Sequence, residues 1–386
     1  MHDGGVVCSF IPPYILSRIA ERGDEEQREH ARVAMETAAQ MRGQRLAIGE
    51  MLATAGVAPG EKRRTVYDAH NKRALPGALV RGEGSPASKD TAVNEAYDGA
   101  GNTYEFYSRV VDRNSIDGRG MRLDSSVHFG SKYSNAQWNG RQMIYGDGDG
   151  RLFNRFTAAL EVIGHELTHG VTQYTAALDY NDEPGALNEH FSDVFGVLVK
   201  QYTLKQNAAR ADWLVGAGLL AKGVKGSAVR SMKAPGTAYD DPILGKDPQP
   251  AAMRDYVKTQ EDNGGVHINC GIPNHAFYRV AILLGGRAWE IAGRIWYRTL
   301  TRELRRNASF RDCANATAKV AREMYGEASA ASHAVVEGWA AVGISLRRPV
   351  VHGGPRIQVA DGFVTPVGAA EVPAALVMPK VKRPRT

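Results

Sequence analysis

The spacing of apolar side chains separates a mainly helical second half of the sequence from a first half with shorter repeats. From Phe153 to Ile344, apolar positions recur about every three to four residues, which is the spacing of one face of an α-helix. The expected helices span residues 157–174, 185–202, 274–284, 287–304, 309–325 and 329–342. These segments predict a lobe built from amphipathic helices.

Between Thr65 and Gly150 the pattern changes to short β-prone runs separated by turn residues. The runs cover residues 65–67, 78–80, 127–129 and 142–145, and a helical stretch covers 92–111. Glycines and aspartates at 146–150 form a cluster that could attract a cation, although such clusters are more often only turns. The sequence therefore predicts an α+β fold with a β-rich N-terminal lobe and a mainly helical C-terminal lobe.

The first 62 residues read as a separate segment. The short apolar stretch Phe10–Leu16 precedes a capping pair, Asp24 with Gln27, and a charged amphipathic helix over about 25–52. Glycines then end that helix, and an exposed basic joint follows at 61–64. This order is typical of a removable pro-segment. On the residues alone, an ordinary helical extension is the simpler interpretation.

The clearest chemical motif is His165, Glu166 and His169, in the order His-Glu-x-x-His. Residues four apart share a helix face, so the two imidazoles can point at one tetrahedral Zn²⁺. Glu166 lies one position round the helix, where a base for an activated water belongs. Chance occurrence on a surface helix is the alternative. The apolar flanks argue against it, because a buried histidine pair needs a partner such as a metal.

A second helix start offers further ligands for the same ion. Glu189 supplies an oxygen ligand, and Asp193, four residues on, shares its face. Asp193 can accept the other ring N–H of a ligand histidine. Two imidazoles, one carboxylate and an open fourth position describe a catalytic rather than a structural zinc site.

A glycine pair at 264–265 predicts a tight turn that delivers His267 from a loop. Asp262 is close enough in sequence to orient the His267 ring. Attack on a peptide carbonyl creates an oxyanion that needs a hydrogen-bond donor, and His267 and Tyr180 are candidates. A packed loop histidine is the alternative when His267 is considered without the zinc motif.

Two further stretches bear on substrate binding. Asn135, with the backbone next to it, can bind an extended peptide in strand-like fashion. A strand edge with a buried Trp138 explains the same residues equally well. Arg230 is either a surface charge or a donor to a substrate carbonyl, and the sequence does not choose between the two.

Composition limits the class of protein. Hydrophobic residues make up 43% and charged residues 23%, as in ordinary globular proteins, and no apolar run approaches the roughly 20 residues of a membrane span. The net charge is +6, of which +5 lies in the tail from Ser345 onward. We therefore predict no nucleic-acid partner and no membrane partner.

The three cysteines, Cys8, Cys270 and Cys313, form no disulfide framework and fit a reducing origin. The N-terminus lacks the charged region and the continuous apolar run of a conventional signal peptide. Cytoplasmic synthesis is therefore expected, and secretion by a non-classical route stays open. Cys8 is a candidate zinc ligand in the uncut chain, although a buried apolar cysteine is the commoner fate.

Together these residues resemble the thermolysin-like zinc metallopeptidases over about 65–344. The motifs that carry the resemblance are 102–107, 113–117, 126–128, Asn135 to Trp138, 143–150, the His165 helix, the Glu189 stretch and 262–269. The resemblance implies two lobes, with the zinc helix at the base of the cleft between them. It divides the chain into a leader at 1–62, lobes at 63–156 and 157–344, and a basic Pro-rich tail, expected to be disordered, at 345–386.

The resemblance also implies roles for particular residues. It implies His165, His169 and Glu189 as zinc ligands, Glu166 as base, Tyr180 and His267 as oxyanion donors, Asp262 as the orienting group of His267, and Asp193 as support for a ligand histidine. Substrate-backbone contacts would come from Asn135, Ala136 and Arg230, and an apolar pocket after the scissile bond from Phe153, Val162 and Val229.

The leader resembles the short pro-segments of the protealysin-like subgroup, which carry a Pro-Pro-aromatic element near their start. That resemblance implies a zymogen whose own propeptide is an intramolecular inhibitor. One position departs from the thermolysin pattern, because Lys200 stands where a calcium-binding glutamate is expected. A cation repels a dication, so the double calcium site is predicted to be absent.

The function expected is that of a zinc-dependent neutral endopeptidase acting on peptide and protein substrates. It would cut on the amino side of bulky apolar residues. The alternative is a metal-stabilised, non-catalytic peptide-binding protein. The combination of Glu166, Tyr180 and His267 favours the enzyme.

Overall fold

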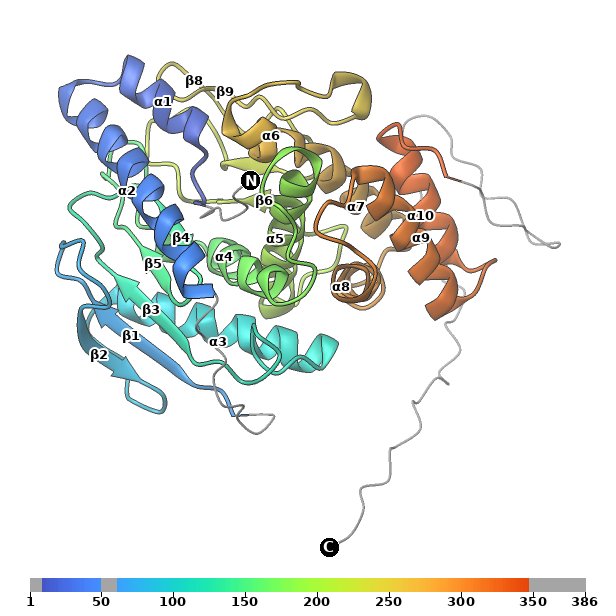
Figure 1. The fold of residues 1–386 in the computed structure, drawn as a ribbon, viewed down its shortest axis with the longest axis horizontal. Helices are drawn as coiled ribbons and strands as arrows, with labels where there is room; N and C mark the ends of the chain where they lie inside the picture. The colour runs from blue at the N-terminus through green and yellow to red at the C-terminus, as the bar shows by residue number, and fades with distance from the viewer. Residues whose placement is uncertain (1–8, 50–60, 347–386) are drawn as a thin grey trace, which may run out of the picture. The chain divides into compact units, whose positions relative to one another are not determined.

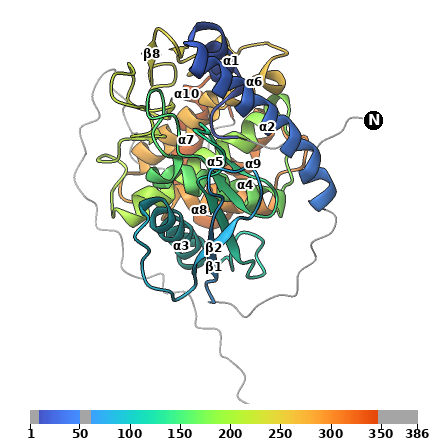
Figure 2. The same ribbon diagram turned by 90° about the vertical axis from the view of Figure 1, so that its left-hand side faces the viewer.

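The computed structural model describes residues 9–49 and 61–346 of the chain, with side chains from 9–41 and 61–346 (Figures 1 and 2). None of the helices in these ranges is both long and apolar enough to cross a membrane. The predicted involvement of Cys8 and the predicted disordered tail lie outside the described residues.

The N-terminal segment forms two helices, α1 (Pro13–Arg22) and α2 (Glu25–Gly49). Pro13 starts α1, where its missing N–H costs nothing. The predicted capping pair is present, because Gln27 N–H donates to Asp24 Oδ1 and Asp24 N–H donates to Gln27 Oε1, both at 3.0 Å. Gly23 lies in the tight joint, where an added Cβ would stand 2.7 Å from the Ile19 carbonyl oxygen.

A five-stranded mixed sheet forms the core of the N-terminal lobe, in the order β2-β1-β3-β5-β4. Its strands are β1 (Arg64–Asp68), β2 (Ala78–Gly82), β3 (Leu123–Val127), β4 (Ala136–Trp138) and β5 (Met143–Tyr145). Strands β1, β3 and β5 run parallel, whereas β2 and β4 pair antiparallel at the two edges. The edge position of β4 leaves one of its sides open to another extended chain.

Helix α3 (Thr91–Val111) packs against this sheet, and Figure 1 shows it alongside β1 and β3. Asp90 caps its start by accepting from the backbone N–H groups of Ala92 and Val93. The aromatic residues Phe106 and Tyr107 are fully buried and face α5 through Phe195.

The C-terminal lobe is mainly helical, as Figures 1 and 2 show. Its larger elements are α4 (Leu160–Gln173), α5 (Asp182–Thr203), α6 (Asp262–Asn269), α7 (Gly271–Leu284), α8 (Ala292–Arg302), α9 (Phe310–Tyr325) and α10 (Ala330–Ala341). Shorter pieces are η1 (Phe156–Ala158), β6 (Leu214–Val215), β7 (Arg230–Ser231), β8 (Asp240–Asp241), β9 (Gly245–Lys246) and η2 (Met253–Asp255).

Helices α4 and α5 pack closely because each has a glycine at the crossing. A Cβ on Gly164 would stand 3.0 Å from the Cα of Gly196. A Cβ on Gly196 would stand 2.4 Å from the Glu161 carbonyl oxygen and 2.9 Å from the His165 nitrogen. This close approach brings the side chains of the two helices to one point.

The α+β class predicted from the sequence is confirmed, while several local predictions were wrong. The strand predicted at 127–129 lies earlier, as β3, because the chain turns at His128 with a positive φ of 52°. The helix predicted from residue 157 begins at Leu160, after the short η1. The joint at 61–64 is not fully exposed, because Arg64 is buried and donates at 2.8 Å to Glu83. The four-part division of the chain stays a prediction.

Candidate active site

Helix α4 presents two buried imidazoles whose protonation the neighbouring groups determine. His165 Nδ1 lies 2.8 Å from Asp193 Oδ1, so this nitrogen carries the hydrogen. His169 Nδ1 lies 2.8 Å from the Oδ1 of Asn188. The amide of Asn188 is oriented by its own Nδ2, which donates at 3.3 Å to the carbonyl of Leu178, so Oδ1 accepts from His169. In their neutral forms, both rings therefore have Nε2 as the acceptor nitrogen, which is the atom that could bind a metal.

These two Nε2 atoms lie 3.0 Å apart in a buried site. Facing lone pairs repel each other unless a cation lies between them. The carboxylate of Glu189, on α5, is 3.5 Å from each Nε2. Tetrahedral zinc with ligand bonds of about 2.0–2.1 Å would separate its donors by roughly 3.3 Å. The three donors therefore fit a zinc ion.

Glu166 also lies near the histidines, and its ligand atoms group with theirs within 4.8 Å. Its Oε2, however, accepts the N–H of Trp138 on β4 at 2.9 Å. That contact holds the Glu166 carboxylate between the edge strand and the two imidazoles. Glu189, rather than Glu166, is therefore the carboxylate that could act as the third donor, and Glu166 could then act in proton transfer.

Asp193 is the central acceptor behind the histidines and is completely buried. Besides His165, it accepts from Arg230 through Nε at 2.9 Å and Nη2 at 2.8 Å, and from Asn274 Nδ2 at 2.8 Å. Burial by itself would raise the pKa of Asp193, but Arg230 and His165 outweigh burial and lower it. A permanently ionised Asp193 keeps the hydrogen of His165 on Nδ1.

Behind Asp193, a one-way hydrogen-bond chain continues into the core. The Nε1–H of Trp296 donates to His190 Nε2 at 2.7 Å, so His190 carries its hydrogen on Nδ1. That hydrogen is donated to Asn274 Oδ1 at 2.8 Å, which leaves the Asn274 amide N–H facing Asp193. Burial lowers the pKa of His190 to about 4, in agreement with a neutral ring.

A second group lies on the other side of Glu189. His267 Nδ1 lies 2.7 Å from Asp262 Oδ1, and His267 Nε2 lies 3.2 Å from the hydroxyl of Tyr180, which also donates to Glu189. Burial lowers the pKa of His267, but the carboxylates of Asp262 and Glu189 outweigh burial and raise it. His267 lies in α6 rather than in a loop, although Gly264 and Gly265 have the positive φ expected of a turn.

The N-terminal segment occupies the cleft beside these residues. Phe10 N–H donates to the Ala136 carbonyl at 2.9 Å, and Ile11 N–H donates to Asn135 Oδ1 at 2.8 Å. Arg230 Nη1 donates to the Phe10 carbonyl at 3.3 Å. These contacts hold the segment along the β4 edge, where Ser9 forms an isolated antiparallel bridge with Gln137.

The ring of Phe10 is fully buried between charged and aromatic groups. Its centroid lies 5.4 Å from that of His165, and the Arg230 guanidinium stands 4.7 Å from it. A Cβ on Gly216 would approach both Phe10 and Val229 at 3.0–3.1 Å, so Gly216 and Val229 line this pocket. Val162 is buried in α4, and Phe153 pairs with Leu220 and packs against Phe156. Their part in the pocket stays a prediction.

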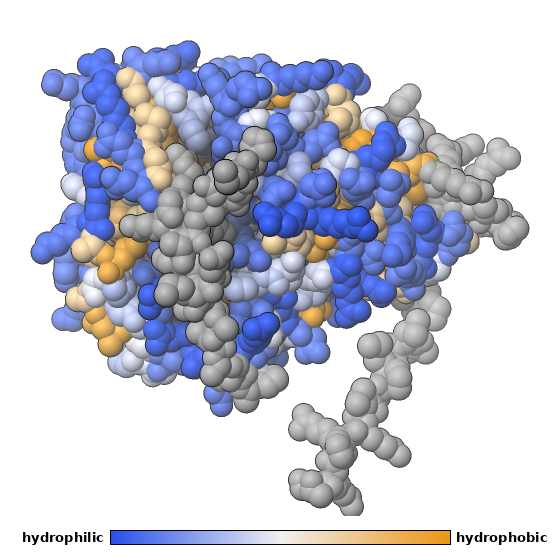
Figure 3. Space-filling model, in the orientation of Figure 1, coloured by the Kyte–Doolittle hydropathy of each residue, from blue (hydrophilic) through white to orange (hydrophobic). Residues whose placement is uncertain are grey.

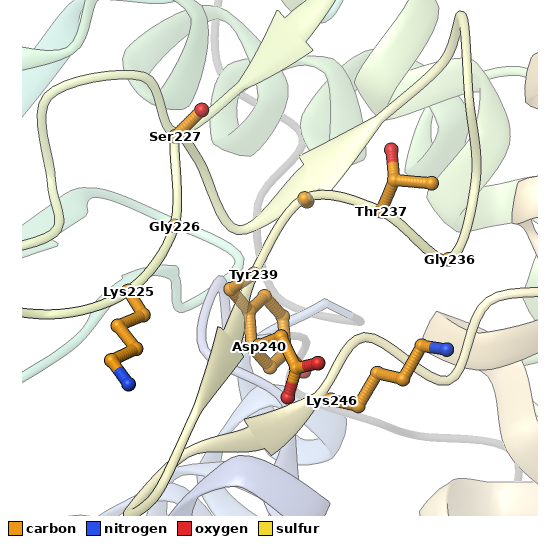
Figure 4. A pocket seen from close by; sticks show the side chains of 9 residues that line it. Lys225, Gly226, Ser227, Gly236, Thr237, Tyr239, Asp240 and Lys246 are labelled. Atoms are coloured by element: carbon orange, nitrogen blue, oxygen red, sulfur yellow. The ribbon is translucent and has the colours of Figure 1, made fainter.

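One hollow at the surface of the described residues lies away from this site. It encloses about 400 Å³ and is lined by residues of the β8–β9 region, among them Lys225, Thr237, Tyr239 and Lys246 (Figure 4). None of its lining residues belongs to the histidine cluster. The face shown in Figure 3 is mainly hydrophilic, with hydrophobic residues in small scattered groups. The cleft at the histidines is filled by the N-terminal segment rather than hollow.

Comparison with known proteins agrees with this geometry. Residues 55–173 match the family described as thermolysin metallopeptidase, catalytic domain, and residues 176–344 match the alpha-helical domain of the same peptidases. Residues 8–43 match the protealysin propeptide. An extracellular metalloprotease of Pectobacterium carotovorum subsp. carotovorum is 49% identical over 346 residues, which is 89% of this chain and 98% of that protein.

The chain belongs to the thermolysin-like metallopeptidases. A thermolysin of Alicyclobacillus acidocaldarius is 39% identical over 287 residues, covering 72% of this chain and half of that protein. The solved structure of the precursor of protealysin from Serratia proteamaculans is 51% identical, has a TM-score of 0.80, and covers 88% of this chain and all of that one. This thermolysin-like peptidase is therefore a metalloendopeptidase made with a propeptide.

Several residues of the site were not found by sequence reasoning. Asn188, His190, Asn274 and Trp296 form the polar contacts behind the histidines. His190 and Asn188 flank Glu189, so their place in the sequence could have indicated that they belong to the site. Asn274 and Trp296 are ordinary helix residues in the sequence, and nothing in their spacing distinguishes them.

Proposed function

We propose that this thermolysin-like peptidase cuts peptide bonds on the amino side of bulky apolar residues, with Glu166 as the proton carrier. The observation that carries this proposal is the position in which Phe10 is bound in the cleft. Its backbone is held by Ala136 and Arg230, and its ring is buried next to His165. A substrate residue bound in the same way would follow the bond to be cut.

Each group has a physical role in this mechanism. Zinc, held by His165, His169 and Glu189, would supply the positive charge that makes a water a better nucleophile. Glu166 takes a proton from that water and passes it to the leaving amine. Tyr180 and His267 donate hydrogen bonds to the carbonyl oxygen as negative charge develops on it.

The decisive experiment compares wild type with Glu166→Ala after removal of the N-terminal segment. The variant should bind stoichiometric zinc and lose at least about a hundredfold in kcat/KM, because general acid–base catalysis is worth about 10²–10⁴-fold. Glu290→Ala, which removes an exposed carboxylate outside the site, controls for loss of charge. A Glu166→Ala variant that still cuts peptides at the wild-type rate would contradict the mechanism. If wild type with zinc binds peptides and cuts none, the chain is the non-catalytic binder.

We further propose that the N-terminal segment inhibits the uncut chain by occupying the substrate position. Phe10 and Ile11 use the Asn135, Ala136 and Arg230 groups that a substrate backbone would need. A peptide substrate cannot reach these groups until the segment leaves.

We also propose that Lys200 replaces a calcium ion. Its ammonium lies 3.3 Å from the buried Glu161 carboxylate and 3.0 Å from that of Asp212, and it donates to the Leu214 carbonyl at 3.2 Å. A bound ammonium already supplies the positive charge that these oxygens need. Added calcium should leave the thermal unfolding midpoint of the zinc-saturated protein unchanged, and a calcium-dependent rise in the midpoint would contradict this.

A further inference from the structure

The register of the N-terminal segment places one particular peptide bond beside the catalytic groups. Ser9 pairs antiparallel with Gln137, the middle residue of β4, and Phe10 N–H donates to Ala136. The next residue of β4, Trp138, donates its N–H to Glu166. The chain therefore approaches Glu166 as it runs back from Phe10 to Ser9.

The residues on both sides of this bond are also held by contacts. On the carboxyl side, Arg230 holds the Phe10 carbonyl, and the Phe10 ring lies against His165. On the amino side, Ser9 is buried against β4. These contacts on both flanks favour the amide that joins Ser9 to Phe10 as the bond of this segment beside Glu166 and the two histidines.

We propose that the enzyme cuts its own Ser9–Phe10 bond within the folded precursor. This inference rests on the proposed function, and it names a bond that is separate from the one that frees the catalytic lobes. Release of α1 and α2 requires a cut beyond Gly49, whereas this cut releases only residues 1–9.

The reaction is a simple hydrolysis. The oxygen of water bonds to the Ser9 carbonyl carbon, and Glu166 takes one of its protons. The C–N bond breaks, its electron pair stays on the Phe10 nitrogen, and that nitrogen receives the proton from Glu166. The products are a carboxylate on Ser9 and an amine on Phe10, which takes up a further proton at neutral pH.

The remaining segment stays in place after this cut. Phe10, Ile11, Ile15 and Ile19 are all buried, and Arg18 Nη1 donates to the carbonyls of Leu244 and Lys246. Removing these large apolar side chains from water favours the bound segment. The new ammonium of Phe10 would face the Ala136 carbonyl that now accepts its amide hydrogen. The cut precursor therefore keeps its cleft filled, as a bound product.

The test is the intact mass of the full-length, zinc-loaded precursor over time. The chain should lose residues 1–9 and retain Phe10 as its first residue, at a rate that does not change on tenfold dilution. Glu166→Ala should keep residues 1–9, even when mixed with wild type. Phe10→Leu should still be cut, whereas Phe10→Asp should be cut at least about tenfold more slowly, because a buried charge is unfavourable in an apolar pocket.

A second readout needs neither zinc nor activity. In metal-free protein, the backbone amide of Ile11 should exchange slowly with deuterium, and Asn135→Ala should make it exchange at least about tenfold faster. Fast deuterium exchange of the Ile11 amide in wild type would contradict the proposed binding position of the segment. This measurement also separates loss of this binding position from loss of the fold, because core amides of α4 should stay protected in both proteins.

The outcomes separate this inference from the proposed function. If the enzyme cuts an added peptide but keeps residues 1–9 attached, or removes them only between molecules, the inference is wrong and the proposed function stands. If the zinc-loaded enzyme, with its N-terminal segment removed, cuts no peptide at all, the proposed function is wrong and the inference falls with it.

Discussion

At the scale of single residues, hydrogen-bond direction determines what each polar atom of the site can do. Asp193 can only accept, so the nitrogen of His165 that faces it must donate. Trp296 can only donate, so the chain through His190 to Asn274 has one direction. Both constraints keep the hydrogen of His165 on Nδ1, so its Nε2 is the acceptor nitrogen that faces the metal position.

A substitution at Asn274 tests whether hydrogen-bond partners behind His165 affect metal binding, because Asn274 donates to Asp193 rather than to the metal position. Asn274→Leu keeps the volume and removes the donor to Asp193. We expect zinc affinity to fall by about 10–100-fold, as for other outer partners of metal ligands, measured by competition with a chelating dye. Trp296→Phe should lower zinc affinity less, because Trp296 reaches Asn274 only through His190. Unchanged zinc affinity in Asn274→Leu would show that Asp193 is held well enough without it.

His128 gives a pH-dependent prediction away from the cleft. It lies 2.8 Å from Asp147 and 2.8 Å from Asp90, and its hydrogen bond with Asp147, partly opposed by burial, raises its pKa to about 9. A raised pKa stabilises the fold fully below the unfolded value of about 6.5, and this contribution disappears as pH rises through the folded value. Wild type should exceed His128→Gln in unfolding midpoint at about pH 6, and the difference should shrink by about pH 9.5. An equal difference at both pH values would contradict the pairing.

At the scale of elements, the glycines between α4 and α5 determine how near the metal-binding side chains come. Helices normally pack 8–10 Å apart, and small residues allow the closer approach. The backbone of α5 at Gly196 lies against the backbone of α4 at Glu161 and His165. The helix that carries Glu189 is therefore positioned directly on the helix that carries the histidines.

Gly196→Ala should disturb this contact. The added carbon meets backbone atoms at 2.4 and 2.9 Å, which cannot move separately, so we expect a loss of about 1–3 kcal/mol in unfolding free energy and weaker zinc binding. Gly293→Ala in α8 is the matched control. There the nearest atom is a methyl carbon of Leu198 at 2.8 Å, which can rotate, and alanine favours a helix by up to about 1 kcal/mol. Denaturant unfolding compares the two, and equal effects would show that the backbone contact is not special.

At the scale of the whole molecule, the N-terminal segment contacts both lobes. It pairs with the edge of β4 in one lobe and binds Arg230 and the β8–β9 turn of the other. Where α1 meets α2, Asp24 pairs with Arg151 at 2.6 Å, and Glu26 pairs with Lys132. These surface pairs contribute little individually, so the buried side chains near Phe10 provide most of the binding.

Removing the segment should therefore activate the enzyme. A site for a specific protease, placed within residues 50–60, allows the folded chain to be cut and the segment washed away. We expect kcat/KM for a peptide with phenylalanine after the cut bond to rise by at least about tenfold, since the segment occupies the cleft at a high effective concentration. The same treatment of Glu166→Ala should give no rise. Equal activity of the intact and trimmed enzymes would contradict inhibition by the segment.

Local geometry explains why much of the site could be predicted from the sequence. His165 and His169, and likewise Glu189 and Asp193, are four residues apart, and a helix places such pairs on one face whatever surrounds it. The α+β class also followed from local periodicity, because a repeat of two and a repeat of 3.6 differ within a few residues. Strand β3 was misplaced because its polar residues, Ser125 and Ser126, are buried by the neighbouring strands rather than by their own preference.

Contacts between distant parts of the chain decided the rest. Asn274 reaches Asp193 across 81 positions, and Arg230 reaches Phe10 across 220, so no spacing rule could relate them. Arg230 was ambiguous in the sequence, and packing made it a buried donor that links Asp193 to the Phe10 carbonyl. Short sequence motifs thus supply the residue types that zinc-assisted hydrolysis requires. The orientation of those groups depends on burial, which only the assembled core provides.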